Sequence, residues 1–428
     1  MELLPFGKLP PYKARVFVPA ELKIDNWDAI APIFDQLDTA IDECISAADL
    51  EAWLLKVSEL GAILDEDGSR RYIAMTCHTS VDAAKRAYLD FVENIEPHLK
   101  ERFFQLATKF ISHPNRADLP MSRYEILNRD WQSTVDLFRE DNVPLETEES
   151  KLGQQYQENM GALTVEFNEE EKTLVQMGVY LQETDRSVRQ EAWELVANRR
   201  LAVADECDEQ FGQLKDIRIQ LAKNAGYGNY RDFKHIAKGR FDYQPEDCFK
   251  FHEAVEKVVM PAYNELLAER KDKLGLGALR PWDTTVDPDG LEPLKPFSEV
   301  EDMVAKTKAI FDQVDDELAG GFQIMRDQKL LDLANRKGKA PGGYQSSLPE
   351  ARLPFIFMNA VGLQRDVETL LHEAGHAFHT LAAQEEDIHE YQHAPLEFCE
   401  VASMSMELVG NEHLGEFYSE EDCVRARR

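Results

Sequence analysis

The chain has 428 residues, with 48 Lys and Arg against 80 Asp and Glu, which gives a formal net charge of −32. So acidic a chain argues against nucleic acid and anionic membranes as partners, because both bind basic surfaces. No apolar run approaches the roughly 18–20 residues that cross a bilayer, and the first residues lack a signal-peptide pattern. Six scattered cysteines without a CxxC pair favour a reduced setting. We therefore expect a globular cytoplasmic protein.

The first part of the chain has a helical pattern. Apolar residues recur at helical spacing from Asn26 to about Arg139, and Pro114 and Pro120 separate successive helices. The run 143–145 contains a proline and marks a boundary. We predict an N-terminal helical domain over residues 1–145 and a second domain over residues 146–428.

The second domain opens with a short strand or extended linker at residues 163–167. A long helix is then predicted from Thr184 to Ala222, with Thr184 or Asp185 as its N-cap. A further helix follows from Pro245 to about Lys273, and residues 275–296, rich in Gly, Pro and Asp, form a loop. The fold is therefore expected to be mainly helical.

Residues 338–359 interrupt the helical pattern. Phe355 to Met358 favour a strand, whereas Pro349 and Pro354 would each remove a hydrogen-bond donor from a ladder. Because prolines are tolerated at a sheet edge, we predict an edge strand or hairpin near the surface. Such an edge presents unpaired amides that an extended peptide could use, although it could equally be a simple cover over a helical core.

The chemistry is concentrated in the sequence His372-Glu373-Ala374-Gly375-His376, an HExxH motif. In a helix, His372 and His376 lie within about 40° of each other on one face, where their imidazoles can bind one Zn²⁺ ion. The apolar residues of the same segment gather on the opposite face, so the helix should dock through that face and present Glu373 with the histidines.

A catalytic zinc site takes a third protein ligand and leaves one position open. The segment after Pro395 reads as a second helix that carries Glu397, Glu400 and Glu407. Glu400 and Glu407 share a helical face, as Glu397 and Glu400 do to a lesser degree. Other candidates are the histidines at positions 389, 393 and 413. Spacing alone does not choose among them.

Four segments together resemble the thimet oligopeptidase and oligoendopeptidase F family of zinc peptidases. These are 341–344 (PGGY), 354–359 (PFIFMN), 366–379 (DVETLLHEAGHAFH) and 395–403 (PLEFCEVAS). Weaker similarities occur at 224–230 and 279–283. The resemblance is strong over about 340–405, recognisable from about 150, and vague before that.

The resemblance implies a multi-helical, two-lobed peptidase with a small β-sheet, whose edge strand lies beside the HExxH helix. It implies one Zn²⁺ per chain, with His372, His376 and Glu400 as ligands and Glu373 as general base. Glu368 matches an acidic position that can hydrogen-bond a ligand imidazole. The implied activity is endoproteolysis of short peptides, with attack by a water that zinc and Glu373 activate. The expected contacts with an extended substrate are Gly343, Tyr344, Phe355 and Asn359.

Family members continue past the third ligand into a segment whose His and Tyr residues stabilise the oxyanion. Neither His413 nor Tyr418 matches that pattern, so we interpret the chain as C-terminally incomplete. Loss of oxyanion donors costs on the order of 10²–10³ in rate. Two alternatives follow: a second polypeptide supplies the missing helices, or the chain is a catalytically impaired zinc- or peptide-binding fragment.

Overall fold

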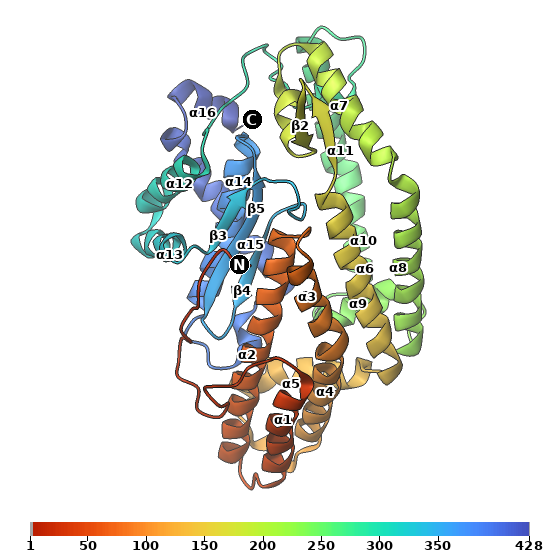
Figure 1. Cartoon of the computed structure of the whole chain (residues 1–428), viewed down its shortest axis with the longest axis vertical. Helices are drawn as coiled ribbons and strands as arrows, with labels where there is room; N and C mark the ends of the chain where they lie inside the picture. The colour runs from red at the N-terminus through yellow and green to blue at the C-terminus, as the bar shows by residue number, and fades with distance from the viewer. Residues whose placement is uncertain (1–2, 428) are drawn as a thin grey trace.

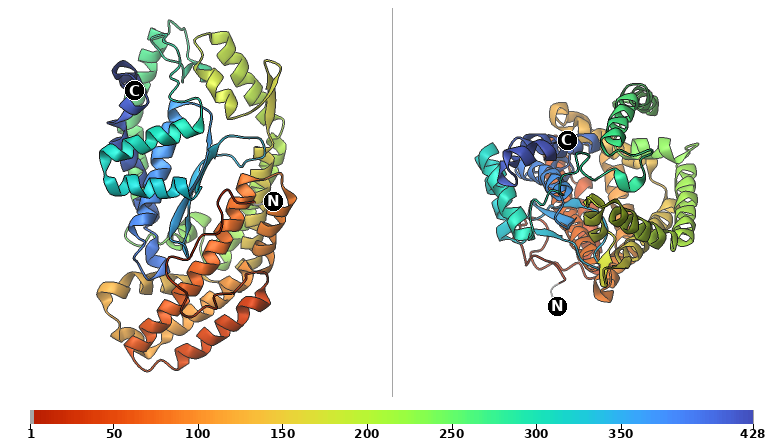
Figure 2. Two further views of the ribbon diagram at one scale, coloured as in Figure 1. Left: turned by 60° about the vertical axis from the view of Figure 1, so that its left-hand side comes forward. Right: turned by 90° about the horizontal axis from the view of Figure 1, so that it is seen from above.

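A computed structural model describes residues 3–427, and the protein is mainly helical with two small sheets (Figures 1 and 2). The predicted fold class is therefore confirmed, whereas the division at residue 145 stays a prediction. Within residues 3–427, no helix combines the length and apolar character that a membrane span requires. The six cysteines are all free thiols.

The N-terminal region is a helical bundle around one apolar core, as the periodicity predicts. Trp53 lies in this core against the rings of Phe110 and Trp131, and its indole nitrogen donates to the Leu37 carbonyl at 2.9 Å. The bundle has one 3₁₀ turn between its last two helices, where Pro114 and Pro120 fall. Its elements are α1 (Trp27–Asp42), α2 (Ala47–Cys77), α3 (Asp82–Asn94), α4 (Glu96–Ser112), η1 (Pro114–Asp118) and α5 (Met121–Leu137).

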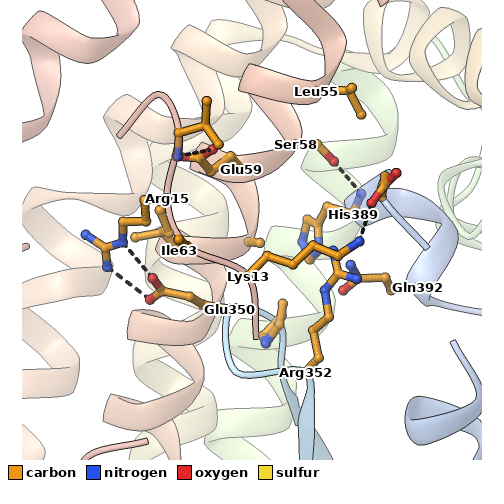
Figure 3. A pocket seen from close by; sticks show the side chains of 15 residues that line it. Lys13, Arg15, Leu55, Ser58, Glu59, Ile63, Glu350, Arg352, His389 and Gln392 are labelled. Carbon is orange, nitrogen blue, oxygen red and sulfur yellow. Dashed lines mark hydrogen bonds and ion pairs between the residues drawn. The ribbon is translucent and has the colours of Figure 1, made fainter. Parts of the chain in front are cut away.

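The segment before α1 runs across α2 and ties it to the later part of the chain (Figure 3). Arg15 makes a two-pronged ion pair with Glu350, with nitrogen–oxygen distances of 2.6 and 3.0 Å. The carboxylate of Glu59, on α2, accepts hydrogen bonds from the backbone nitrogens of residues 16–18. A pocket of about 240 Å³ lies beside these contacts and reaches His389.

The middle of the chain forms the tall helical side of the molecule at the right of Figure 1. The helix predicted from Thr184 to Ala222 is two helices, separated near Val203, and Asp185 caps the first. The elements are α6 (Val143–Gly161), β1 (Thr164–Phe167), β2 (Glu170–Thr173), η3 (Gln176–Gln182), α7 (Arg186–Leu201), α8 (Ala204–Asn224), α9 (Tyr230–Ala237), α10 (Pro245–Ala254), η4 (Val255–Val259), α11 (Met260–Lys273) and η5 (Pro281–Asp283).

The helix predicted from Pro245 to Lys273 is continuous but contains the π-helical segment η4. Pro261 follows this segment and has no backbone N–H to donate to the preceding turn. A π-bulge is one way in which a helix accommodates such a lost hydrogen bond.

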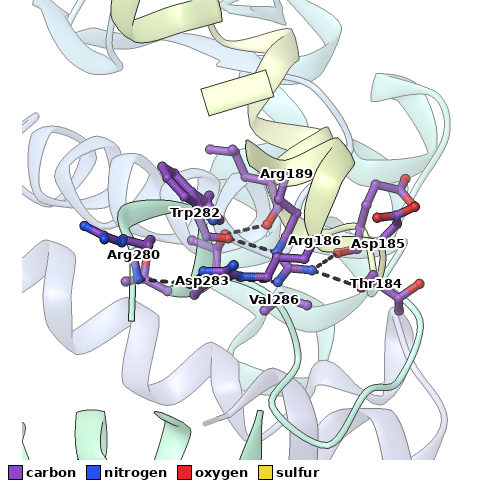
Figure 4. A network of polar contacts seen from close by, with 12 residues as sticks. Thr184, Asp185, Arg186, Arg189, Arg280, Trp282, Asp283 and Val286 are labelled. Atoms are coloured by element: carbon purple, nitrogen blue, oxygen red, sulfur yellow. Dashed lines mark hydrogen bonds and ion pairs between the residues drawn. The ribbon is translucent and has the colours of Figure 1, made fainter. Parts of the chain in front are cut away.

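A buried carboxylate fastens the loop after α11 to the start of α7 (Figure 4). Asp283 is fully buried and accepts two hydrogen bonds from Arg186, at 2.9 and 2.8 Å, and one from Arg189 at 3.2 Å. The backbone nitrogen of Arg280 donates to the same carboxylate. The Arg186 hydrogen bonds are the main reason that the pKa of Asp283 is lowered to about 2.

The C-terminal part contains a three-stranded sheet covered by helices. The strand order is β3-β5-β4, with β5 parallel to β3 and antiparallel to β4. Its elements are α12 (Val300–Val314), α13 (Asp316–Asp327), β3 (Leu331–Ala334), β4 (Tyr344–Leu348), β5 (Leu353–Ala360), α14 (Gln364–Ala382), η6 (His389–Gln392), α15 (Leu396–Asn411), η7 (Leu414–Glu416) and α16 (Glu420–Ala426).

The prediction that Phe355 to Met358 lie in an edge strand is wrong, because β5 is the central strand and β4 is the edge beside α14. The backbone nitrogen of Ile356 donates to Leu330, on the β3 side. Strand amides alternate in direction, so the position of Pro354 also faces that side. β3 pairs only from Leu331, opposite Ile356, and Pro354 therefore removes no ladder bond. The uninterrupted apolar run of β5 reflects burial on both faces.

Candidate metal centre

The HExxH helix α14 starts at a firmly fixed point. The carboxylate of Asp366 accepts hydrogen bonds of 2.8–2.9 Å from the backbone nitrogens of residues 361–363. An acidic side chain at the third helical position thus binds the amides of the turn that leads into the helix, as one half of a capping box does. The predicted apolar face is buried, and its members include Val367, Leu370, Ala374, Ala377 and Phe378. Docking through this face sets the direction of the two histidines.

Three potential ligand atoms converge between α14 and α15. The Nε2 atoms of His372 and His376 lie 3.4 and 3.8 Å from Oε2 of Glu400. The two rings are nearly perpendicular, with centroids 4.9 Å apart. One ligand atom from each of the three residues lies within 4.8 Å of the others. Glu397 points elsewhere, to Arg240 and Tyr243.

Glu400 reaches the histidines because α15 packs very closely on α14. A Cβ atom at Gly375 would lie 2.6 Å from Cα of Ser403 and 2.7 Å from the Ala402 carbonyl oxygen. Only glycine allows this approach of the two backbones. The hydroxyl of Ser403 also donates to Oε2 of Glu400 at 3.0 Å, which orients the carboxylate.

A second carboxylate on α15 orients His372. Oε1 of Glu407 lies 2.6 Å from Nδ1 of His372, so the ring can donate from Nδ1 and turn Nε2 toward Glu400. The sequence prediction gave this role to Glu368, but Glu368 is hydrogen-bonded to Gln364 at 3.4 Å. In the sequence, Glu407 shares a helical face with Glu400. This pattern makes both acids candidates, but it does not indicate which one binds the metal and which one orients the His372 ring.

Glu373 lies beside the three converging residues in a dry environment. Its side chain is buried, and burial raises its pKa to about 7; His372 opposes this effect and Glu400 adds to it. Within residues 3–427, its Oε2 atom has no hydrogen-bond partner, while the backbone of Gln345 in β4 donates to the carboxylate. A buried carboxyl with a free oxygen is suited to exchange a proton with a ligand.

The four residues expected to contact substrate lie in different surroundings. A Cβ atom at Gly343 would lie 3.4 Å from Oε1 of Glu373, so this residue borders the centre. The Tyr344 hydroxyl is 2.6 Å from that of Thr76, and its ring stacks on Phe357. The side-chain amide of Asn359 donates to the carbonyls of residues 340 and 342 at 2.9 Å.

Phe355 is the exception among these four residues, because its side chain is fully buried in the central strand. It packs against Phe6 in the core, with ring centroids 5.5 Å apart. Its position was assigned on the assumption that its strand was the edge. Of the two edge strands, β3 and β4, the one packed beside the HExxH helix is β4.

Comparison with protein families identifies the class of this chain. Residues 17–138 match the peptidase M3 N-terminal domain, and residues 179–423, more than half of the chain, match peptidase family M3. The chain belongs to peptidase family M3.

Two curated relatives are oligoendopeptidases of Lactococcus lactis. An oligoendopeptidase F homolog of subspecies lactis (strain IL1403) is 25% identical over 155 residues, which are 36% of this chain and 25% of that protein. The chromosomal oligoendopeptidase F of subspecies cremoris is 21% identical over 238 residues, 55% and 38% of the two chains. The matches thus span well under half the length of these relatives.

Two solved structures share the fold over nearly the whole chain. A Bacillus anthracis (strain Ames) protein assigned as an oligoendopeptidase F superposes with a TM-score of 0.90 at 26% identity, covering 95% of this chain and 74% of that one. PZ peptidase A, solved with an inhibitor, gives a TM-score of 0.91 at 26% identity, with 96% and 73% covered.

Proposed function

We propose that the chain is a zinc-dependent endopeptidase that hydrolyses internal bonds of short oligopeptides. The observation that carries this proposal is the convergence of His372, His376 and Glu400 beside the buried carboxyl of Glu373. Membership of peptidase family M3 and similarity to oligoendopeptidases support the substrate class.

The residues present fit a zinc ion. Two imidazole nitrogens and one carboxylate oxygen form a common ligand set of hydrolytic zinc sites. The expected spacing between two ligand atoms in a tetrahedral site with bonds of about 2.0–2.1 Å is about 3.3–3.4 Å. The His372–Glu400 separation is 3.4 Å, and Glu407 holds the other nitrogen of that ring. When bound, zinc would supply a Lewis acid that activates a water and polarises the scissile carbonyl.

Glu373 then moves the proton. Its free Oε2 accepts a proton from the attacking water, and the same carboxyl donates it to the leaving amine. An extended peptide would pair with the edge of β4 that has no partner strand within residues 3–427, and the backbone of this strand at Gln345 already contacts Glu373. A substrate bound in this way would have one of its internal peptide bonds beside the metal centre.

One observation favours the alternative, a catalytically impaired zinc- or peptide-binding protein. The side chain of Glu400 is 51% exposed, and apolar side chains on the same helix, including Phe398 and Leu408, face solvent. The centre is therefore open over α15. Catalysis by fixed dipoles and charges is strongest in a site that excludes water.

An assay with internally quenched fluorescent peptides separates the two proposals. We expect cleavage at an internal bond, checked by mass spectrometry, loss of cleavage with a chelator, and recovery with Zn²⁺. Glu373→Gln should lower kcat by about 10²–10⁴-fold while zinc stays bound. Glu368→Gln, on the same helix, is the matched control and should retain activity. Zinc binding without cleavage in the unaltered chain would favour the alternative.

A further inference from the structure

A second cluster of metal-ligating side chains lies on the connection between α14 and α15. Asp65 comes from α2, His389 is the first residue of η6, and His393 follows η6 directly. One ligand atom from each residue lies within 4.8 Å of the others, as in the first centre. The proposed peptidase mechanism uses none of these three residues.

One pair of side chains in this cluster has the spacing of two ligands on one metal ion. Nε2 of His389 lies 3.1 Å from Oδ2 of Asp65, close to the roughly 3.3–3.4 Å between ligand atoms of a tetrahedral zinc site. The rings of His389 and His393 are 5.7 Å apart at 77°, and the corresponding values for His372 and His376 are 4.9 Å and 85°. Both clusters thus present two imidazoles, four positions apart, to one carboxylate.

The least exposed member, His389, is held in place before any ion binds. Its backbone nitrogen donates to the hydroxyl of Ser58 (Figure 3). The preceding Ile388 is buried in the core of the N-terminal bundle. A Cβ atom at Gly61, one turn before Asp65, would lie 3.4 Å from Cδ2 of His389, so the ring packs closely against this turn of α2.

A simple ion pair accounts for only part of this arrangement. An Asp–His pair needs only one ring and gives the second imidazole, that of His393, no role. A divalent cation uses all three side chains, because both imidazoles bind it in the neutral form and the carboxylate offsets part of its charge. Asp65 and His393 are exposed, so further coordination positions would face solvent.

We propose that Asp65, His389 and His393 bind a second divalent transition-metal ion, of the class that imidazole and carboxylate ligands prefer, such as Zn²⁺. The ion clamps the connection between the two helices of the first centre to α2. That connection leads directly into α15, which carries Glu400, so the second ion holds the segment that precedes a proposed ligand of the first.

The test uses the full chain with its first centre removed by His372→Ala and His376→Ala. The metal is removed with a chelator, and the protein is then dialysed to equilibrium against micromolar Zn²⁺. We expect one equivalent of zinc per chain, measured by elemental mass spectrometry, and a rise in Tm. Adding His393→Ala should reduce binding at least tenfold. His252→Ala, which removes an exposed histidine on α10, is the control and should leave the equivalent bound.

A milder variant guards against misfolding. Asp65→Asn changes an exposed carboxylate to its isostere in the otherwise unaltered chain, and should remove one equivalent while leaving the first centre loaded. In the chain that carries His372→Ala and His376→Ala, replacement of Zn²⁺ by Co²⁺ should give visible absorption bands that His393→Ala abolishes. Absence of zinc from the variant without the first centre, or an equivalent that survives both His393→Ala and Asp65→Asn, would overturn the proposal.

Discussion

Oε1 of Glu407 lies 2.6 Å from Nδ1 of His372, so a carboxylate of α15 fixes the orientation of a ring on α14. We expect Glu407→Ala to weaken zinc binding at the first centre by about 10–100-fold, because the ring loses its orienting acceptor. Competition with a chromogenic chelator measures this affinity. Glu368→Ala removes a carboxylate that contacts Gln364 instead and should leave the affinity nearly unchanged. Equal effects of the two substitutions would contradict the role of Glu407.

Gly375→Ala should disturb the packing of α14 on α15. The added methyl would lie 2.6 Å from Cα of Ser403, so the helices must separate, at a cost of about 1–3 kcal/mol in the free energy of unfolding. Because Glu400 is on the displaced helix, zinc affinity should fall as well. Urea denaturation measures the loss in the free energy of unfolding.

The control for this substitution is Gly212→Ala, in the middle of α8, where a Cβ atom meets nothing within 4 Å. Alanine is the better helix former, so this variant should be more stable by up to about 1 kcal/mol. If both glycine variants behaved alike, close helix packing would not be the reason for Gly375.

Asp283 should contribute to acid denaturation. Its pKa is about 2 in the folded protein, below the ordinary value of 3.8, chiefly because of the Arg186 hydrogen bonds. A carboxyl with a lowered pKa stabilises the folded state above its unfolded pKa, and this contribution is lost as pH falls from about 4 to 2. The contribution is on the order of 2 kcal/mol.

Asp283→Asn should therefore lower stability at pH 7 and flatten the pH dependence of Tm between about pH 4 and 2. Thermal melts of the variant and the unaltered chain, at pH 7 and between about pH 4 and 2, measure these two changes. Asp216→Asn alters an exposed carboxylate of α8 and serves as the control. An unchanged pH profile in Asp283→Asn would show that the arginine contacts do not stabilise the fold.

Pro354→Ala should have little effect on stability. The backbone of Pro354 faces β3, but pairing with β3 starts only opposite Ile356, so residue 354 forms no ladder hydrogen bond there. We expect a loss of at most about 1 kcal/mol, from greater freedom of the unfolded chain. Ile356→Pro, two residues later, removes the hydrogen bond to Leu330 and should cost about 3 kcal/mol or more. Urea denaturation distinguishes the two variants, and a large loss in Pro354→Ala would contradict this strand register.

Local patterns were sufficient for much of this protein. The N-terminal helices follow from apolar periodicity, and the HExxH spacing places His372 and His376 on one helical face, because both features depend only on helix geometry. The π-helical segment before Pro261 and the break near Val203 were missed, since one turn of altered hydrogen bonding leaves the apolar pattern almost unchanged.

Contacts between distant segments decided the rest. From spacing alone, Glu397, Glu400 and Glu407 were equal candidates, and only the close packing at Gly375 shows which carboxylate meets both rings. Strand order made β4 rather than β5 the edge, and Asp65 meets His389 from more than 300 positions away. Spacing reports which residues share a face of one helix or strand, whereas the residues that meet across elements depend on how those faces pack.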